Sequence, residues 1–175
     1  TVTESTIVSY VGENKPGLIS QTIDCLTKLG GNIGDLSFAT LGKGCECTLI
    51  YELSDETKKS DVEKALKKLD ALSSGDLVVK DFEQDQERGP SKKITHRIIF
   101  SGGDQKGLIS KIISTLDNHG ALIVRMNAEK IEGKESDQYI SRFSISIRDE
   151  KAPACLAAVV TIASELKLLF RYETN

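Results

Sequence analysis

The 175-residue sequence lacks the features that assign a chain to a membrane or a secretory route. No apolar run approaches the roughly 20 residues that a bilayer-spanning helix requires. Residues 1–4 have neither the basic start nor the apolar core of a signal peptide. We therefore expect no membrane association and a cytoplasmic location, with an organellar location after removal of a leader left open.

A basic excess is missing as well. Lys and Arg total 23 against 26 Asp and Glu, which gives a formal net charge of −3. Proteins that bind along a phosphate backbone need clustered positive charge, so we expect no direct binding of nucleic acid. Hydrophobic residues at 39% and charged residues at 28% are typical of a globular chain rather than a disordered one.

Cysteine is scarce and unpatterned, with four residues, no CxxC and no histidine at ligand spacing. This excludes a disulfide framework, and we expect no bound metal. In a strand, Cys45 and Cys47 would share one face with Leu49 and Tyr51, and free cysteine is a common core residue. A packing role in a reducing compartment is the expectation.

Catalytic motifs are also absent. Only His96 and His119 are present, no serine stands in a GxSxG elbow, and neither a GxxxxGK[ST] nor a GxGxxG loop occurs. His119 takes the place that Leu29 has in the first half of the chain, so we expect it to pack at a rim. The sequence predicts no enzymatic activity and no cofactor.

What is present is an internal repeat. The run Gly17-Leu18-Ile19-Ser20 recurs as Gly107-Leu108-Ile109-Ser110, and at the same offset Gly30 matches Gly120 without a gap. The charged segment between the halves contains Gly89-Pro90 and no apolar anchor, which is typical of a linker. We predict a first domain at 1–83, a linker at 84–94 and a second domain at 95–175.

Each half changes its hydrophobic period in the same order, strand, helix, strand, strand, helix, strand. This order predicts an α+β fold, two ferredoxin-like βαββαβ domains in tandem, each an antiparallel four-stranded sheet with two helices on one face. Domains this small bury little surface alone, and the other sheet face needs a cover, so we expect a homodimer through sheet or helix faces.

The predicted strands are 6–11, 33–41, 45–53, 77–82, 95–100, 122–131, 139–148 and 168–172. Helices are predicted after Pro16, from a capping box at 60–63, from Leu108 and from Pro153, with glycine ends at 30–31 and 120.

The loop between the first strand and first helix of each half has the parts of a small anion site. It reads Asn14-Lys15-Pro16-Gly17 in one half and Asp104-Gln105-Lys106-Gly107 in the other. Glycine allows close approach of a ligand to the backbone, and helix N-terminal N–H groups favour a carboxylate. The side chain of Asn14 or Asp104 would accept from an ammonium group. The alternative is that these two residues merely cap the helices that follow.

The combination of these loops with the segments that follow the first helices resembles the signature of ACT domains. The matching segments are 14–19 with 29–33 and 104–109 with 119–123. The tandem form without an attached enzyme is similar to the glycine cleavage system transcriptional repressor family. The regulatory unit of formyltetrahydrofolate deformylases is similar too, but the catalytic domain of those enzymes is not found in this sequence.

The resemblance implies that an amino acid or another small metabolite binds between two such domains. In the serine-sensing domains of phosphoglycerate dehydrogenases, the roles of two ligand-holding asparagines map onto Asn14 and Asn32. The histidine that precedes the loop Asn in that family is replaced by Gly12, which argues against serine as the ligand.

If the two halves pair side by side, each loop faces the second strand of the other half. Asn14 and Gly17 would then face Leu122 and Ile123, whereas Asp104 and Gly107 would face Asn32 and Ile33. We expect unequal sites, with the second the better binder of a zwitterion. The candidate ligand-binding residues are Asn14, Gly17, Leu18, Asn32, Ile33, Asp104, Gly107, Leu108, Leu122 and Ile123.

The leading functional hypothesis is a non-catalytic regulator that senses an amino acid and modulates a partner protein. The resemblance implies that any effect on genes passes through that partner, because the sequence has no helix-turn-helix. Two alternatives stay open at this stage. One is a regulatory subunit or fragment of an amino-acid or folate metabolic enzyme, and the other is a dimerisation module without a ligand.

Overall fold

A computed structural model describes residues 2–85 and 93–175 of the chain, which fall into two compact units. In the first unit the elements are β1 Val2–Glu13, α1 Leu18–Lys28, β2 Asn32–Leu41, β3 Gly44–Glu52, α2 Lys59–Lys67, a 3₁₀ turn η1 Asp70–Leu72 and β4 Gly75–Asp85. In the second they are β5 His96–Gly103, α3 Leu108–Asn118, β6 Leu122–Ile131, β7 Gln138–Ser146, α4 Ala152–Glu165 and β8 Leu169–Thr174. Within the described residues, no helix has the length and apolar character needed to cross a membrane.

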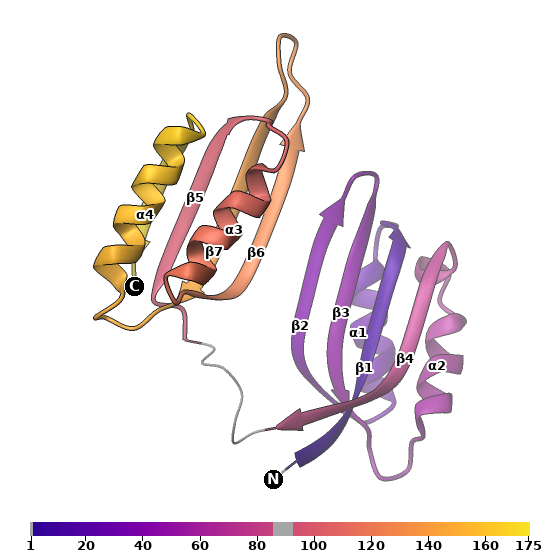
Figure 1. Cartoon of the computed structure of the whole chain (residues 1–175). Coiled ribbons are helices and arrows are strands. Elements are labelled where there is room, and N and C mark those ends of the chain that lie inside the picture. The colour runs from indigo at the N-terminus through magenta and orange to yellow at the C-terminus, as the bar shows by residue number, and fades with distance from the viewer. Residues whose placement is uncertain (1, 86–92) are drawn as a thin grey trace. The chain divides into compact units, whose positions relative to one another are not determined.

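Each unit contains one four-stranded antiparallel sheet. The strand orders are β2-β3-β1-β4 and β6-β7-β5-β8, so the first strand of each unit is central and its last strand is at an edge. The third strand lies between the first and the second, and this is the split βαβ arrangement of the ferredoxin-like fold. In Figure 1 each sheet carries its two helices on a single side. The predicted fold class and strand order are confirmed.

The cores explain why the helices gather on one face. Alternate residues of the central strands point inward and meet the apolar stripes of both helices. The first core includes Val8, Tyr10, Leu49, Leu26 and Leu66, and the second includes Ile98, Phe100, Phe143, Ile112 and Val159. Cys45 and Cys47 are buried free thiols, as the strand period predicts, and Cys155 is a third buried free thiol.

Local boundaries differ from the sequence prediction in three places. The N-cap of α2 is Lys58 rather than the predicted Ser60, two residues earlier, and the Asp61 carboxylate accepts the Lys58 N–H at 2.9 Å. This helix ends at Lys67, with Asp70–Leu72 forming a separate 3₁₀ turn. Strand β4 extends to Asp85 by pairing with the start of β1, so residues 84 and 85 of the predicted linker belong to a strand. Residues 86–92 of that predicted linker lie outside the described residues.

Both first helices end at a left-handed glycine, Gly30 at φ 83° and Gly120 at φ 75°, as predicted. The N–H of the residue that follows this glycine, Gly31 or Ala121, has a different hydrogen-bond acceptor in each unit. In the second unit, the Ala121 N–H donates to the Leu116 carbonyl at 3.1 Å and closes the end of α3.

In the first unit a tyrosine hydroxyl takes the place of that direct bond. The Tyr51 hydroxyl accepts from the Gly31 N–H at 3.0 Å and donates to the Leu26 carbonyl at 2.7 Å. A Cβ on Gly31 would lie 2.4 Å from the Tyr51 ring and 2.4 Å from the Glu52 carbonyl oxygen, which explains the second glycine of the first unit. Ile145, the β7 counterpart of Tyr51, has no hydroxyl, and alanine follows Gly120 there.

We predict that Gly31 and Tyr51 are energetically coupled. Tyr51→Phe leaves the Gly31 N–H and the Leu26 carbonyl unpaired, which costs about 1–3 kcal/mol of unfolding free energy in the first unit. Gly31→Ala is destabilising because the added methyl group clashes with the Tyr51 ring and with the Glu52 carbonyl oxygen, and a change at Tyr51 relieves only the first of these clashes. The double variant Gly31→Ala/Tyr51→Ile reproduces the residue pair of the second unit and should lose less stability than the sum of the single variants Gly31→Ala and Tyr51→Ile.

Amide hydrogen exchange of the β1 and β3 core amides measures this cycle, because it reports on the first unit separately. Tyr10→Phe is the control, since that hydroxyl donates a single 2.9 Å bond to the Glu13 carbonyl. Strict additivity of the Gly31 and Tyr51 changes would contradict the coupling.

Candidate functional site

Helices α1 and α3 begin at a glycine in the left-handed region. Gly17 has φ 83° and Gly107 has φ 76°, and each is the N-cap residue of its helix without a side-chain capping bond. A turn precedes each cap, closed by the Leu18 N–H on the Lys15 carbonyl at 3.2 Å and by the Leu108 N–H on the Gln105 carbonyl at 3.3 Å. The interpretation of Asn14 and Asp104 as helix caps is therefore wrong, because both lie three residues too early.

This geometry leaves backbone donors free at both helix starts. An ordinary cap places a side-chain oxygen on the second or third N–H of the helix. Within the described residues, no acceptor lies on the N–H groups of Ile19, Ser20, Ile109 or Ser110. By contrast, α2 carries Asp61 in its first turn, and α4 has a proline there. Only α1 and α3 thus combine unpartnered N–H groups with an unobstructed, acid-free first turn among the described helices.

A hollow of about 440 Å³ opens at the first of these helix starts. It is lined by Asn14, Lys15, Pro16, Gly17, Leu18, Ile19 and Ser20. Asn14 and Gly17 are exposed, and Pro16 lies in the turn before the cap rather than in the helix. The hollow therefore offers backbone donors, one amide side chain and an apolar rim at Ile19.

The second residue of each loop, Lys15 or Gln105, donates hydrogen bonds that attach the loop to the segment before the last strand of its unit. Lys15 donates to the Asp70 carbonyl at 3.3 Å and to the Ser73 hydroxyl at 3.1 Å. Gln105 donates in the same way to the Leu166 carbonyl at the end of α4. These bonds hold the loops in place while Asn14 and Asp104 face solvent.

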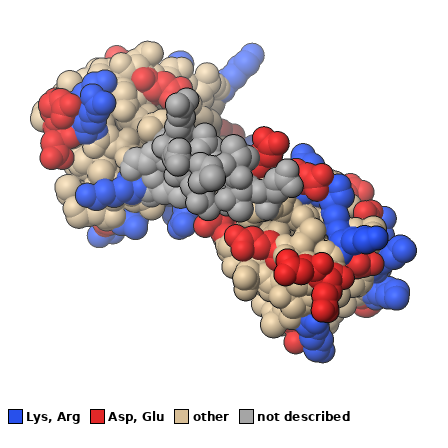
Figure 2. All heavy atoms as spheres, turned by 90° about the horizontal axis from the view of Figure 1, so that it is seen from below, with Lys and Arg blue, Asp and Glu red and all other residues tan. Residues whose placement is uncertain are grey.

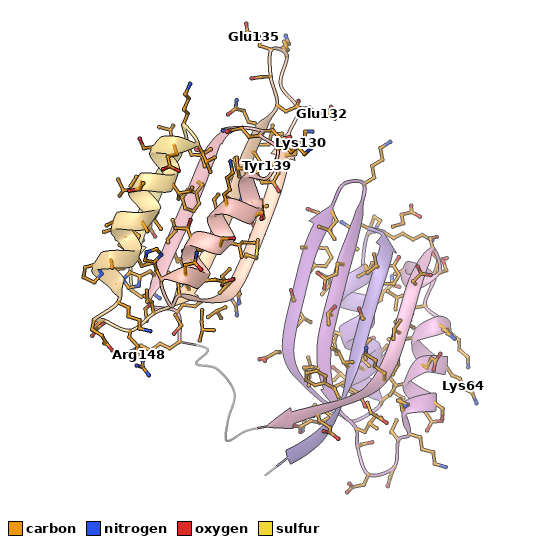
Figure 3. The ribbon with its side chains drawn as sticks, viewed as in Figure 1. Lys64, Lys130, Glu132, Glu135, Tyr139 and Arg148 are labelled. Carbon is orange, nitrogen blue, oxygen red and sulfur yellow. The ribbon has the colours of Figure 1, made fainter. Side chains whose placement is uncertain are left out.

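The two loops differ in what the first residue contacts. The Asp104 carboxylate lies 3.3 Å from the Lys130 ammonium, which is also 3.3 Å from the Asp137 carboxylate. The Asp104 N–H additionally donates to the Asp137 carbonyl at 3.1 Å. Lys130 is at the base of the β6–β7 hairpin, with Glu132 and Glu135 further out (Figure 3). The second loop is therefore tied to this hairpin.

These hydrogen bonds have an electrostatic consequence. The carboxylates of Asp104 and Asp137 raise the pKa of Lys130 above its usual value. The ammonium is thus stabilised in the folded state, and this contribution is lost only as the pH rises through the raised pKa. Lys130 was not among the predicted site residues, because only the pairing of β6 with β7 brings it to Asp104 and no local motif marks it.

We predict that Lys130→Gln loosens the second loop. Without the ammonium, Asp104 and Asp137 repel each other, so the Asp104 amide should exchange its hydrogen several-fold faster at neutral pH. Lys134→Gln is the matched control, since Lys134 is exposed in the same hairpin. Equal protection of Asp104 in both variants would show that Lys130 does not hold this loop.

The structure does not bring the loop residues and the β2 or β6 candidates together within a unit. Asn32 pairs with Glu52 at one end of β3, whereas the loop follows Glu13, which pairs with Gly44 at the other end. Eight strand residues separate these ends, a distance of about 26 Å. The same register separates Leu122 from Asp104 in the second unit. A site that uses both sets therefore requires two units.

The remaining candidates fall into two groups. Leu18 and Leu108 are 2% and 3% exposed, so their side chains belong to the cores and only their backbones can line a site. Asn32 and Leu122 are exposed, and Ile33 and Ile123 are half-buried against their cores.

Gly12, which precedes the first loop, has no room for a side chain. A Cβ there would lie 2.5 Å from the Gly75 Cα and 2.9 Å from the Ser74 carbonyl oxygen. Both obstacles are backbone, because β1 and β4 meet at this point with glycine on each strand. The structure thus excludes the histidine that the serine-sensing family has at this position.

Gly12→Ala is predicted to destabilise the first unit by about 1–3 kcal/mol, because backbone atoms cannot yield to the added methyl group. Gly103→Ala should be close to neutral, since its Cβ would meet nothing within 4 Å. Hydrogen exchange of the core amides in each unit compares the two, and equal small effects would contradict the steric argument.

The two histidines, His96 and His119, have structural contacts. The His119 Nδ1–H donates to the Thr115 carbonyl at 2.8 Å, which caps the end of α3. His96 is buried beside Tyr172, with ring centroids 5.1 Å apart, and its Nδ1 bonds the Thr95 hydroxyl. Across the described ranges, no three His, Cys, Asp or Glu side chains are grouped to hold a metal ion.

In the view of Figure 2, basic and acidic side chains intermingle without a continuous field of either sign.

No protein-family model and no curated protein matches this sequence. Solved structures do match along the whole chain. A protein of unknown function from Galdieria sulphuraria is 16% identical, with 100% of this chain and 99% of that chain covered and a TM-score of 0.76. A proposed glycine cleavage system transcriptional repressor is 15% identical, covers 98% of each chain and has a TM-score of 0.61.

The chain has the fold of a tandem ACT-domain protein. An isolated ACT domain, from the GTP pyrophosphokinase of Chlorobium tepidum, also matches, at 21% identity over 47% of this chain and 100% of that one, with a TM-score of 0.36. At such identities the likeness concerns architecture, and the two compact units are accordingly referred to as the first and second ACT units.

Proposed function

We propose that the chain is a non-catalytic regulatory protein that binds an amino acid or a similarly small metabolite and thereby modulates a partner protein. The observation that carries this proposal is the glycine N-cap of α1 and α3. Both helix starts keep backbone donors free that a side-chain cap would otherwise occupy. The two units share this loop conformation, and a helix start whose N–H groups have no acceptor within the loop favours a ligand with its own carboxylate.

The ligand's two charges suit different parts of the loop. Its carboxylate would accept from the N–H groups of the first helical turn, and the helix dipole favours this placement. Its ammonium would donate to the Asn14 amide oxygen or, with charge assistance, to Asp104. A small side chain, as in glycine, fits a hollow whose lining ends at Pro16 and Ile19.

We propose that each site is completed by the β2 or β6 start of another ACT unit. Because about 26 Å of strand separates the two ends of one sheet, Asn32 cannot reach the loop of its own unit. In the proposed pairing, Asp104 and Gly107 share a ligand with Asn32 and Ile33, and Asn14 and Gly17 share one with Leu122 and Ile123. The first of these sites has more polar groups, but a ligand ammonium must displace Lys130 from Asp104 there.

Regulation would follow from the coupling between ligand binding and the arrangement of the units. A ligand that binds one arrangement of the units more tightly shifts the equilibrium toward it by the difference in binding free energy. The full-length similarity to a proposed transcriptional repressor supports action through a partner.

Calorimetric titration of the chain with a panel of amino acids tests the proposal. We expect binding of a small amino acid, and we expect Asn14→Ala and Asn32→Ala to weaken their respective sites about tenfold by removal of a hydrogen bond. Asn127→Ala is the matched control, because this exposed asparagine lies in the middle of β6, five residues and about 17 Å along the strand from Leu122.

Two outcomes would contradict the proposal. Absence of binding by every amino acid favours a dimerisation module without a ligand. Equal loss from Asn14→Ala, Asn32→Ala and the control removes the assignment of these residues to sites, even if the chain does bind an amino acid.

A further inference from the structure

The helix-free faces of the two sheets carry opposite charge. In each sheet the residues that alternate with the core residues point to the face without helices. On the second unit's sheet these include Arg97, Arg125, Arg142 and Arg171, which we name the arginine face. On the first unit's sheet they include Glu13, Glu46 and Asp76, which we name the acidic face.

The register places the four arginines in two adjacent rows. Arg97 pairs with Ser144, which pairs with Arg125, and this forms one row. In the next row Ile99 lies between Arg142 and Arg171. Two carboxylates share the face, Glu129 at 3.4 Å from Arg142 and Glu173 at 3.2 Å from Arg171. The arginine face thus keeps a positive excess.

The choice of arginine at these positions is selective. The sequence contains six arginines and many more lysines, yet four arginines and no lysine occur on this face in the described strands. Arginine is enriched in protein interfaces, since its planar guanidinium pairs with carboxylates through two hydrogen bonds and tolerates desolvation. A face intended only for contact with water would not distinguish the two residues.

The acidic face has the complementary pattern. Glu13 and Glu46 lie in neighbouring rows near the loop end of the sheet, and Asp76 pairs with Val11 in the row of Glu46. The Thr48 hydroxyl donates to the Glu46 carboxylate at 2.7 Å, which holds this carboxylate over the face. Lys80 is the basic residue of this face among the described strand positions, and no arginine is found in the first 85 residues.

Both faces also carry aliphatic side chains that water contacts. Val11 and Val78 are about half exposed on the acidic face, and Leu169 is 77% exposed beside the arginines. Four strands of about eight residues present roughly 500 Å² per face. Two such contacts would bury roughly 2,000 Å², which lies at the upper end of the standard range for stable protein interfaces.

We propose that the arginine face of one chain binds the acidic face of a second copy of the same chain. In the proposed assembly, two copies are related by a two-fold axis and make both contacts, since each chain contributes one face of each kind, and the assembly closes as a dimer. This inference concerns the sheet faces and is independent of the amino-acid site at the helix starts.

A charge-swap experiment tests the proposal. Wild-type chain, 19.1 kDa as a monomer, should sediment as a dimer at micromolar concentrations. Arg97→Glu/Arg142→Glu should be monomeric, because two acidic faces then meet, and Glu46→Arg/Asp76→Arg should be monomeric for the converse reason. An equimolar mixture of the two variants should recover the dimer, since both contacts again join opposite charges.

The matched control is Lys64→Glu/Lys68→Glu, which makes the same change in charge on exposed positions at α2, away from the sheet face (Figure 3). This variant should stay dimeric. Circular dichroism verifies that each variant is folded, and Arg97→Gln/Arg142→Gln serves as a milder replacement that should raise the dimer dissociation constant at least about tenfold. The wild-type dimer should also weaken with salt, because the attraction is screened.

Three results would each overturn the proposal: a monomeric wild-type chain, dimers that survive both reversals, or a mixture of reversed variants that stays monomeric. Binding of an acidic protein or an oligonucleotide to a monomeric wild-type chain would assign the arginine face to that partner instead.

Discussion

The backbone at Gly17 and Gly107 has to turn into the left-handed region immediately before a helix, and much of the molecule follows from this constraint. A residue with a Cβ is strained in that conformation. With glycine as the cap, no side-chain oxygen covers the first turn, so its N–H groups face solvent at one end of the sheet. The preceding turn then places Asn14 or Asp104 beside those donors, and Lys15 or Gln105 anchors the loop from behind.

The fold follows from patterns that are local and repeated. The duplication of Gly17-Leu18-Ile19-Ser20 and the change from strand to helix period identify two βαββαβ units, and the glycines at 30 and 120 mark the helix ends correctly. The predicted Ser60 cap of α2 is wrong, and so is the alternative that Asn14 and Asp104 cap α1 and α3, although all three are good capping residues by composition. Which residue caps a helix depends on the φ of the preceding backbone, and residue type alone does not determine it.

Contacts between distant strands are the part that sequence reasoning could not supply. Lys130 meets Asp104 only because β6 pairs with β7 in one register, and Tyr51 reaches Gly31 only because β3 lies next to β2. Both contacts distinguish the units from each other. The first unit presents an exposed amide at its loop, whereas the second presents a carboxylate that a lysine already neutralises. A regulator with two such loops would respond over two ranges of ligand concentration.

The central claim is that free backbone donors at two helix starts bind the carboxylate of a small amino acid. An NMR titration of the ¹⁵N-labelled chain tests it most directly, because each amide reports on its own surroundings. We expect the largest shifts at Ile19, Ser20, Ile109 and Ser110, with the first-turn amides of α2 and α4 unchanged. A bound amino acid that leaves those four amides unshifted, or that shifts all four helix starts alike, would contradict the claim.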